Sequence, residues 1–371
     1  MSIIRNRRQF LRQMLALTIT GVGASACRTS KPTAVSPAPA EPVQAVAATP
    51  GAAAAKPTLA PALVRPSPSA PRAASPTQAA VQPTAQPPAA PAGASPTAAD
   101  TAYLAVARGS GADPAELTRR AIAALGGIER FVKPGANVIL KPNICTAYYG
   151  PEYASTTNPQ VVAAVVALCL GAGAKRVRVM DAPFGGTAQN AYVKSGIADA
   201  VQAAGGEMEV MSRMRYRALD LPNGRKIQQW QVYGDALDAD VLINLPIAKD
   251  HGSTRLTLGM KNMMGLIQDR SGFHSRGLDQ CIADLNSSLR PQLTVVDAVR
   301  ILMENGPTGG NLNDVKATDT VIASADVVAA DAYAATLFGM TGKDIGYIRL
   351  GAEMGLGQMD LNAIKTVEIP V

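Results

Sequence analysis

The sequence predicts an α/β domain with a mostly parallel sheet, helices on both faces and a short antiparallel segment near residues 207–233. Beyond residue 100, short runs rich in β-forming residues alternate with helical patterns of about 10–15 residues, which is typical of βαβ units. Two of these helical patterns begin with a capping residue followed by proline. No internal repeat of about 20–50 residues is apparent, so nothing indicates a repeat architecture.

The expected elements follow one another in a regular order. We expect strands at 103–107, 137–140, 177–180, 240–245, 293–296, 320–322 and 366–369. We expect helices at 114–125, 159–170, about 188–204, 278–289, 325–337 and 345–354. Asp113 and Asn158 are the expected N-caps of the first two helices, and Gly171 and Gly173 end the second.

The first 26 residues have the pattern of a signal peptide. Four arginines and no acidic residue precede an uncharged run at 13–26, which at about 14 residues is shorter than the roughly 20 that span a bilayer. The segment from Asn6 to Arg12 resembles a twin-arginine signal, with Asn6 in place of the usual Ser or Thr. A Sec signal with a chance pair of arginines is the alternative. The resemblance implies the twin-arginine translocase as a partner and a destination in the cell envelope, outside the cytoplasmic membrane.

Cys27 follows Ala24-Ser25-Ala26, which resembles a lipoprotein cleavage motif, although Leu is usual where Ala24 stands. The resemblance implies acylation of Cys27 and attachment to the membrane. Ordinary signal peptidase would also cut before Cys27, because Ala24 and Ala26 form an A-x-A site. The mature chain therefore starts at the same residue in both cases, and only the lipid differs.

Residues 27–99 are expected to form an extended, disordered linker in front of a domain at 100–371. Segment 28–99 is rich in Ala, Pro, Ser and Thr and holds 16 of the 27 prolines. It has too few large apolar residues to offset the entropy lost on folding. Its prolines favour polyproline II, as a spacer next to a membrane anchor would require.

The net charge of +7 comes from the signal and the linker rather than from the domain. The four arginines of the signal contribute +4 and the linker another +4, which leaves −1 for the remaining 272 residues. Nucleic-acid binding requires a basic face, and this charge balance gives it no support. We therefore exclude nucleic acids as partners.

The three cysteines of the domain are widely spaced. Cys145, Cys169 and Cys281 include no C-x-x-C pair, so the sequence supports neither a disulfide framework nor a zinc or iron–sulfur site. Cys169 falls in an apolar helical pattern and is expected in the core. Cys145 follows a strand near the presumed site, where it is either a packed residue or a reactive thiol.

Polar side chains follow several of the buried strands. Ligands of open α/β sheets bind beyond the carboxyl ends of the strands, so these residues are candidates for a site. They are Lys141 and Asn143, Asp181, Asn244 with Lys249, and Asp297.

The segment 244–274 concentrates the chemically useful residues. It contains both histidines of the chain, His251 and His274, together with Lys249, Lys261 and Asn262. Histidine suits proton transfer or metal binding, and a partly buried lysine binds an anion or acts as a nucleophile. The glycines of the segment would let the backbone approach a ligand closely. A mobile surface loop with solvated polar residues is the alternative.

A set of short motifs runs through residues 103–340. They are Lys141-Pro142-Asn143, the helix start Asn158-Pro159, a Gly-Ala-x-x-Val strand ending at Asp181, Asn244-Leu-Pro-x-x-Lys249-x-His251, Lys261-Asn262-x-x-Gly265 and His274. Together they resemble the bacterial and archaeal family called domain of unknown function 362. Asp250 departs from the small polar residue that is usual there. The resemblance implies no activity. Some members carry a ferredoxin-like segment, but this chain lacks the cysteines for one.

Three functions fit these residues. The first is an enzyme for a small anionic substrate, with His251, His274 and Lys249 as catalytic residues. In that case substrate would be bound by Lys141, Asn143, Asp181, Asn244, Lys261 and Asn262. The second is a tethered protein that binds the same ligand without catalysis.

The third function depends on a metal or cofactor and includes redox and racemase-like chemistry. His251 and His274 with Asp297, Asp250 or Asp181 would supply two histidines and one carboxylate. The identity of a metal or cofactor stays open. Twin-arginine export carries folded proteins, often with a cofactor loaded, and so favours a bound one.

Overall fold

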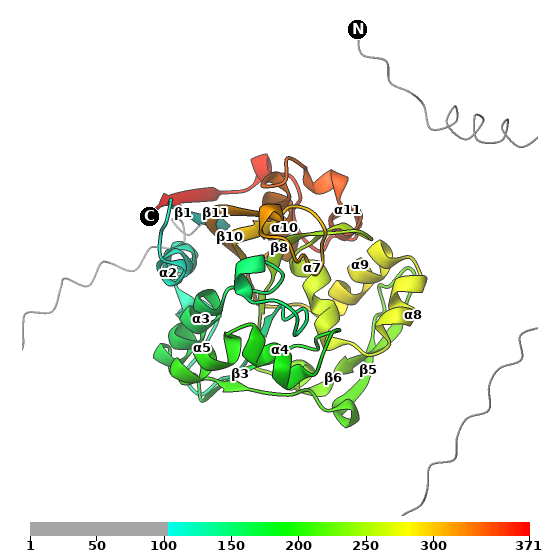
Figure 1. Ribbon diagram of the computed structural model, residues 1–371. Helices are drawn as coiled ribbons and strands as arrows, with labels where there is room; N and C mark the ends of the chain where they lie inside the picture. Colours follow the sequence, from blue (N-terminus) through cyan, green and yellow to red (C-terminus); the bar gives the residue numbers. More distant parts are fainter. Residues whose placement is uncertain (1–102) are drawn as a thin grey trace, which may run out of the picture. The chain divides into compact units, whose positions relative to one another are not determined.

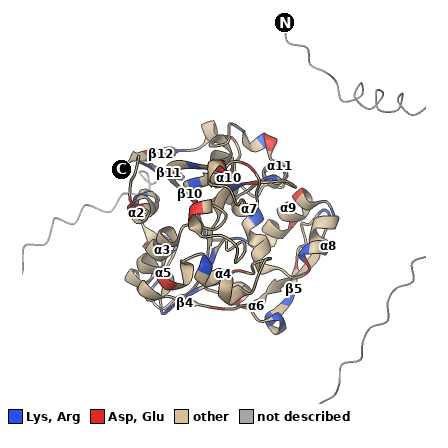
Figure 2. Cartoon of the chain, viewed as in Figure 1, with Lys and Arg blue, Asp and Glu red and all other residues tan. Residues whose placement is uncertain are grey.

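The computed structural model describes residues 103–371. The predicted signal peptide at 1–26, the lipid-attachment residue Cys27 and the linker at 27–99 lie outside the described residues. Within 103–371, no helix has both the length and the apolar character that a membrane crossing requires. Acidic and basic segments alternate over the view in Figure 2, in agreement with a domain of nearly balanced charge.

A ten-stranded sheet forms the centre of the described region (Figure 1). The strand order is β12-β1-β11-β10-β7-β2-β3-β4. In addition, β8 pairs with β10, and β9 pairs with β8. The strands are β1 (Leu104–Arg108), β2 (Asn137–Pro142), β3 (Arg176–Val179), β4 (Glu207–Met208), β7 (Val241–Leu245), β8 (Ile247–His251), β9 (Arg255–Thr257), β10 (Leu293–Leu302), β11 (Val315–Ser324) and β12 (Thr366–Pro370). Most neighbouring pairs are parallel, whereas β11 is antiparallel to β1 and β10, and β9 to β8. The α/β prediction is confirmed.

Helices cover both faces of this sheet (Figure 1). They are α2 (Pro114–Ala124), α3 (Pro159–Gly171), α4 (Ala188–Lys194), α5 (Ile197–Ala203), α6 (Gly234–Asp238), α7 (Gly259–Asn262), α8 (Arg270–Ser275), α9 (Leu278–Ser288), α10 (Val327–Thr336) and α11 (Gly346–Glu353). One apolar core includes α2, α3 and α5, and the other includes α7, α9, α10 and α11. Alternate residues of β1 enter the two cores: Leu104 and Val106 the second, Ala105 and Ala107 the first. Each face therefore has a core of its own, and residues of a strand alternate between them.

The predicted helix caps are confirmed. The side chains of Asp113 and Asn158 accept hydrogen bonds from Ala115 N and Gln160 N, and each cap precedes a proline in the first turn. The helix expected at 188–204 is instead two helices, because Gly196 has a φ of 71° between them.

The segment near 207–233 is only partly antiparallel. Strands β5 (Tyr216–Asp220) and β6 (Gln229–Tyr233) form a separate antiparallel pair. Strand β4, however, pairs in parallel with β3 at the edge of the large sheet.

The strand expected at 293–296 is longer than predicted and continues to Leu302, so Asp297 lies within β10 rather than after its end.

A kink at Pro246 shapes the region after residue 245, for which a mobile surface loop was the alternative prediction. Pro246 separates β7 from β8, because proline lacks the N–H that a continuous strand would pair. Its carbonyl still accepts a hydrogen bond from Asp297 N at 2.8 Å. Beyond the kink, β8 pairs with β10, and Lys249 and His251 lie two residues apart on the same side of the strand.

The short helix α7 is held at its start by a buried carboxylate. Asp331 of α10 accepts hydrogen bonds from Gly259 N (2.6 Å) and Met260 N (2.8 Å). These bonds fix the backbone that carries Lys261 and Asn262. A four-residue helix has little intrinsic stability, so its position depends on such contacts.

We therefore predict that Asp331→Ala destabilises the fold. Two buried N–H donors would lose their partner, at a cost of about 1–3 kcal/mol each, so the free energy of unfolding should fall by about 2–6 kcal/mol. Urea denaturation followed by circular dichroism measures the loss. Asp199→Ala, at an exposed aspartate of α5, is the control and should change stability by less than about 0.5 kcal/mol. Equal stability of both variants would contradict this role of Asp331.

Candidate active site

A cavity of about 690 Å³ opens at the carboxyl ends of β2 and β3. Its wall combines residues that follow these strands with residues of β8, α7 and α8. The polar and charged lining residues are Lys141, Asn143, Asp181, Lys249, His251, Thr257, Lys261, Asn262, Arg270, Ser271, His274 and Ser275. Parallel strands present such residues at a common edge, where ligands of α/β folds bind.

A buried ion pair forms the floor of this cavity. Lys141 Nζ lies 2.7 Å from Asp181 Oδ1, and both side chains are almost fully buried. Asp181 also accepts hydrogen bonds from Ile144 N (2.6 Å) and Ala182 N (2.9 Å). Burial lowers the pKa of Lys141, and the charge of Asp181 opposes this shift. The carboxylate thus connects the segment after β2 to the segment after β3.

Gly265 packs directly over this pair. A Cβ atom at this position would lie 1.9 Å from Asp181 Oδ1 and 2.4 Å from Lys141 Nζ. Real atoms do not approach so closely, so only glycine fits without a shift of the ion pair. The Lys261-Asn262-x-x-Gly265 motif therefore has a steric reason for its glycine.

Two asparagines connect the lysines in a continuous hydrogen-bond network. Asn262 Oδ1 accepts from Lys141 Nζ (3.0 Å) and from Asn143 Nδ2 (2.9 Å). Asn143 Oδ1 in turn accepts from Lys249 Nζ at 3.0 Å. Asn262 Nδ2 donates to Lys141 O and to Asn244 Oδ1. Two cationic groups are thus fixed by amide groups of two different segments.

Lys249 is fully paired despite having no carboxylate near it. Its Nζ donates to Ser155 O (2.6 Å), Pro307 O (2.9 Å) and Asn143 Oδ1 (3.0 Å). No ion pair of Lys249 occurs within residues 103–371, and its side chain is 1 % exposed. It is therefore a buried positive charge that neutral oxygens hold in place.

Lys261 differs from Lys141 and Lys249 in its hydrogen-bond partners. Its only hydrogen-bond partner within the described region is the sulfur of Met264, at 3.8 Å. Burial and the neighbouring charge of Lys249 lower its pKa to about 8. A substantial fraction of its amino group is therefore neutral near physiological pH.

His251 is neutral over the whole physiological range. Burial, assisted by the charges of Lys261 and Lys249, lowers its pKa to about 3. Its Nδ1 accepts a hydrogen bond from Ser253 N at 3.0 Å, so the single ring proton is on Nε2. His251 can therefore donate a hydrogen bond from Nε2, but it is a weak base.

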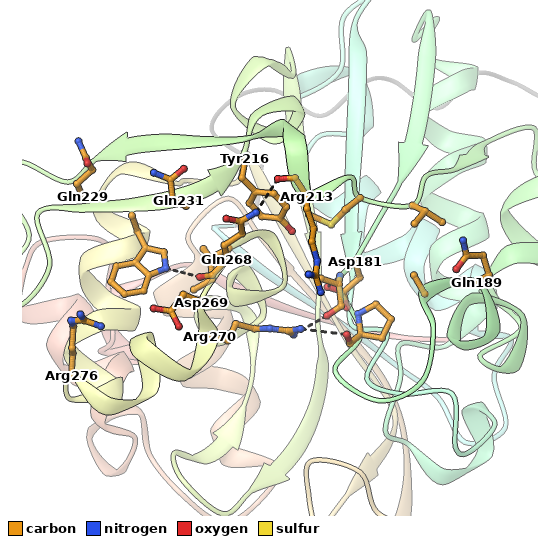
Figure 3. A pocket seen from close by; sticks show the side chains of 17 residues that line it. Asp181, Gln189, Arg213, Tyr216, Gln229, Gln231, Gln268, Asp269, Arg270 and Arg276 are labelled. Atoms are coloured by element: carbon orange, nitrogen blue, oxygen red, sulfur yellow. Dashed lines mark hydrogen bonds between the residues drawn. The ribbon is translucent and has the colours of Figure 1, made fainter. Parts of the chain in front are cut away.

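His274 and Arg270 belong to the short helix α8. His274 is exposed at the rim, and burial together with Lys261 and Arg270 lowers its pKa. Arg270 donates to Ala182 O (2.8 Å) and Pro183 O (3.3 Å), which ties α8 to the segment after β3 (Figure 3). The loss of these bonds would separate the two walls of the cavity.

Arg270 also borders a second cavity of about 920 Å³, drawn in Figure 3. Asp181, Ala182 and Arg270 line both cavities. The second is lined further by Tyr216, Trp230 and several glutamines, and Arg276 lies over the Trp230 ring at 5.2 Å. The Arg270 side chain thus lies between two cavities. The first, which Lys141, Lys249 and Lys261 line, is called the cationic cavity; the second is lined by aromatic and amide side chains.

The comparisons with known proteins agree with the motif analysis. Residues 138–336 match the family model described as Domain of unknown function (DUF362). The chain belongs to this family. The matched region contains every polar residue of the cationic cavity, from Lys141 to Ser275.

A thylakoid-associated protein of Synechocystis sp. is 31 % identical over 215 residues, which cover 56 % of this chain and 64 % of that protein. The chain thus spans less than two thirds of the length of this relative. Among solved structures, the lactate racemase apoprotein from Thermoanaerobacterium thermosaccharolyticum is similar with a TM-score of 0.38. It is 12 % identical, and the match covers 60 % of this chain and 54 % of that chain.

The structure places most of the predicted site residues in the cationic cavity, with two exceptions. Asn244 is buried below it, where its Nδ2 donates to Gly259 O and its Oδ1 holds Asn262. Asp297 accepts from Asn158 N and Val299 N and does not line the cavity. Both side chains satisfy backbone and amide groups inside the fold.

The candidate metal set is not brought together. Within residues 103–371, no three His, Cys, Asp or Glu side chains lie close enough to hold a metal ion. Asp181 pairs with Lys141, and Asp250 accepts a hydrogen bond from Gly306 N. Cys145 is buried against the cavity and its Sγ donates to Pro307 O at 3.4 Å.

Two lining residues had no role assigned to them from the sequence. Arg270 lies between Gly265 and His274, and a charged residue in this glycine-rich segment was the available indication. Thr257 lies in β9, and its buried Oγ1 has no hydrogen-bond partner within the described region. A buried hydroxyl that faces a cavity without a partner indicates a group that a ligand or a water molecule completes.

We predict that Gly265→Ala disrupts the ion pair. The added methyl group must displace Asp181 or Lys141, so thermal stability should fall and the cavity should lose its fixed cation. Differential scanning calorimetry measures the first effect. Gly171→Ala is the matched control, because a Cβ there meets no atom within 4 Å. A melting temperature of Gly265→Ala equal to that of the control would refute the steric account.

Proposed function

We propose that the chain is an enzyme that binds a small carboxylate or phosphate compound in the cationic cavity. The observation that carries this proposal is a surplus of positive charge. Lys141, Lys249, Lys261 and Arg270 line the cavity, whereas Asp181 is the only acidic residue that residues 103–371 contribute to its wall. Such a surplus in a partly closed cavity attracts an anion and strengthens its electrostatic interactions.

The charged groups divide into two kinds. Lys141 and Lys249 supply a fixed field, because oxygen atoms already occupy their N–H groups. Direct hydrogen bonds to the anion would come from Lys261 Nζ, His251 Nε2 and Thr257 Oγ1. These donors belong to α7, β8 and β9 and line the same cavity. Fixed charges combined with free donors are the arrangement that preorganised catalytic sites use.

The affinity for the anion should depend on pH through Lys261. An anion binds best when this amine is protonated. Because its pKa is about 8, affinity should be constant at lower pH and should fall as the pH rises through about 8. His251, with a pKa of about 3, should contribute no pH dependence between pH 5 and 9.

We predict that Lys261→Met weakens the binding of oxalate at pH 7 by about tenfold or more, since a charge-assisted hydrogen bond contributes roughly 1.5–3 kcal/mol. Isothermal titration calorimetry measures the affinity, and Lys343→Met, at an exposed lysine, is the control. Binding by both variants with wild-type affinity would rule out this site. Turnover is then sought by screening small carboxylates and phosphate esters with the wild-type chain.

We also propose that the chain is exported by the twin-arginine translocase and anchored to the envelope through an acylated Cys27. The pattern of Arg7, Arg8 and the small residues before Cys27 supports this proposal. The thylakoid association of the Synechocystis relative is in keeping with a membrane-attached member of the family. An anchor of this kind explains a proline-rich spacer in front of the domain.

We predict that Cys27→Ala moves the mature protein from the membrane fraction to the soluble envelope fraction. The acylated cysteine is the proposed anchor, and a chain without any lipid has no comparable affinity for the membrane, so the protein should be released. Immunoblots of fractionated cells measure this, and Arg7→Lys with Arg8→Lys should retain the precursor in the cytoplasm. An unchanged distribution of both variants would contradict the export proposal.

A further inference from the structure

The three lysines of the cationic cavity differ in how many acceptors they have. An ammonium group has three N–H donors. Lys141 Nζ has three oxygen partners, namely Asp181 Oδ1, Pro142 O and Asn262 Oδ1. All three N–H donors of Lys141 are therefore used by oxygen atoms of the protein.

Lys249 is occupied in the same way. Its three oxygen partners come from three separate segments, which fixes the ammonium group in one position. Neither Lys141 nor Lys249 can therefore turn toward a ligand without breaking several hydrogen bonds. This geometry argues against Lys249 as a nucleophile and leaves it as a fixed positive charge.

Lys261 is the exception. Its side chain is 7 % exposed, and its amino group has no oxygen partner within residues 103–371. Met264 Sδ, at 3.8 Å, is a weak acceptor. The helix α7 that carries Lys261 is held by Asp331, so the amine is presented by a fixed backbone. The amine is thus held by a fixed backbone, and no oxygen atom of the described residues occupies its N–H groups.

We infer that Lys261 is a nucleophile that forms an imine with the carbonyl carbon of an anionic ketone or aldehyde, of which a 2-oxo acid is the simplest. This inference rests on the proposed anion site, which supplies the affinity for the carboxylate. The fixed charges of Lys141 and Lys249 attract that carboxylate into the cavity, while the free amine faces the carbonyl group.

The reaction balances without any further reagent. The lone pair of neutral Lys261 Nζ attacks the carbonyl carbon, and a proton passes from nitrogen to oxygen to give a carbinolamine. The C–O bond then breaks, the hydroxyl group leaves with the second nitrogen proton as water, and a C=N bond remains. His251 Nε2–H is placed to donate a hydrogen bond to the oxygen that becomes the hydroxyl group.

The electrostatics of the cavity favour the same residue. A lysine becomes nucleophilic when burial or a neighbouring cation favours its neutral form. Both causes act on Lys261, since it is buried and lies near Lys249. The amine therefore has a neutral fraction at a pH where exposed lysines are almost fully protonated.

The test is reductive trapping of the full-length chain with pyruvate and sodium cyanoborohydride, followed by peptide mass spectrometry. The expected result is one reduced adduct on Lys261 and none on the exposed lysines under the same conditions. Lys261→Arg should lose this adduct, whereas Lys343→Arg should retain it. No adduct on Lys261, or equal labelling of Lys261 and the exposed lysines, overturns the inference.

Oxalate binding by the same preparations separates this inference from the proposed function. Lys343→Arg, at an exposed lysine outside the cavity, should bind oxalate with wild-type affinity. If wild type binds oxalate but forms no adduct, the nucleophile is rejected and the anion site stands. If wild type does not bind oxalate, the proposed function itself is rejected.

Discussion

The buried Lys141–Asp181 ion pair is the contact on which the cavity depends. It connects the ends of two neighbouring parallel strands and lies directly below Gly265, where no side chain fits. Removal of one partner would leave an uncompensated charge in the interior, which costs several kcal/mol. The pair thus forms the floor of the cavity. The segment after α7 passes directly over it, so the residue at this position, Gly265, must have no side chain.

The hydrogen bonds around the lysines divide them into two kinds: Lys141 and Lys249 supply fixed positive charge, and Lys261 is available for reaction. Lys141 and Lys249 are surrounded by backbone and amide oxygens, which hold positive charge in a place where water cannot screen it. Lys261 experiences that charge without such partners. Burial and the neighbouring charge of Lys249 keep Lys261 partly neutral, and the same charge of Lys249 would attract an anion. A ligand that carries both a negative charge and an electrophilic carbon would use both properties.

Local patterns predicted the fold and much of the cavity wall. Alternating strands and helices with proline-marked caps indicated the α/β class, and the positions after two strands located Lys141 and Asp181. Strand β8 was missed because Pro246 looks like the end of a strand. The pairing of Lys249 was not predictable, because two of its partners are the backbone carbonyls of distant residues, which have no signature in the sequence.

The most direct test of the anion site is a crystal structure of the chain soaked in selenate, with anomalous data collected at the selenium edge. The account predicts a selenium peak in the cationic cavity, within hydrogen-bond distance of Lys261 Nζ, His251 Nε2 and Thr257 Oγ1. Selenate bound only at the surface, with the cavity free of anomalous density, would contradict the claim that this cavity binds small anions.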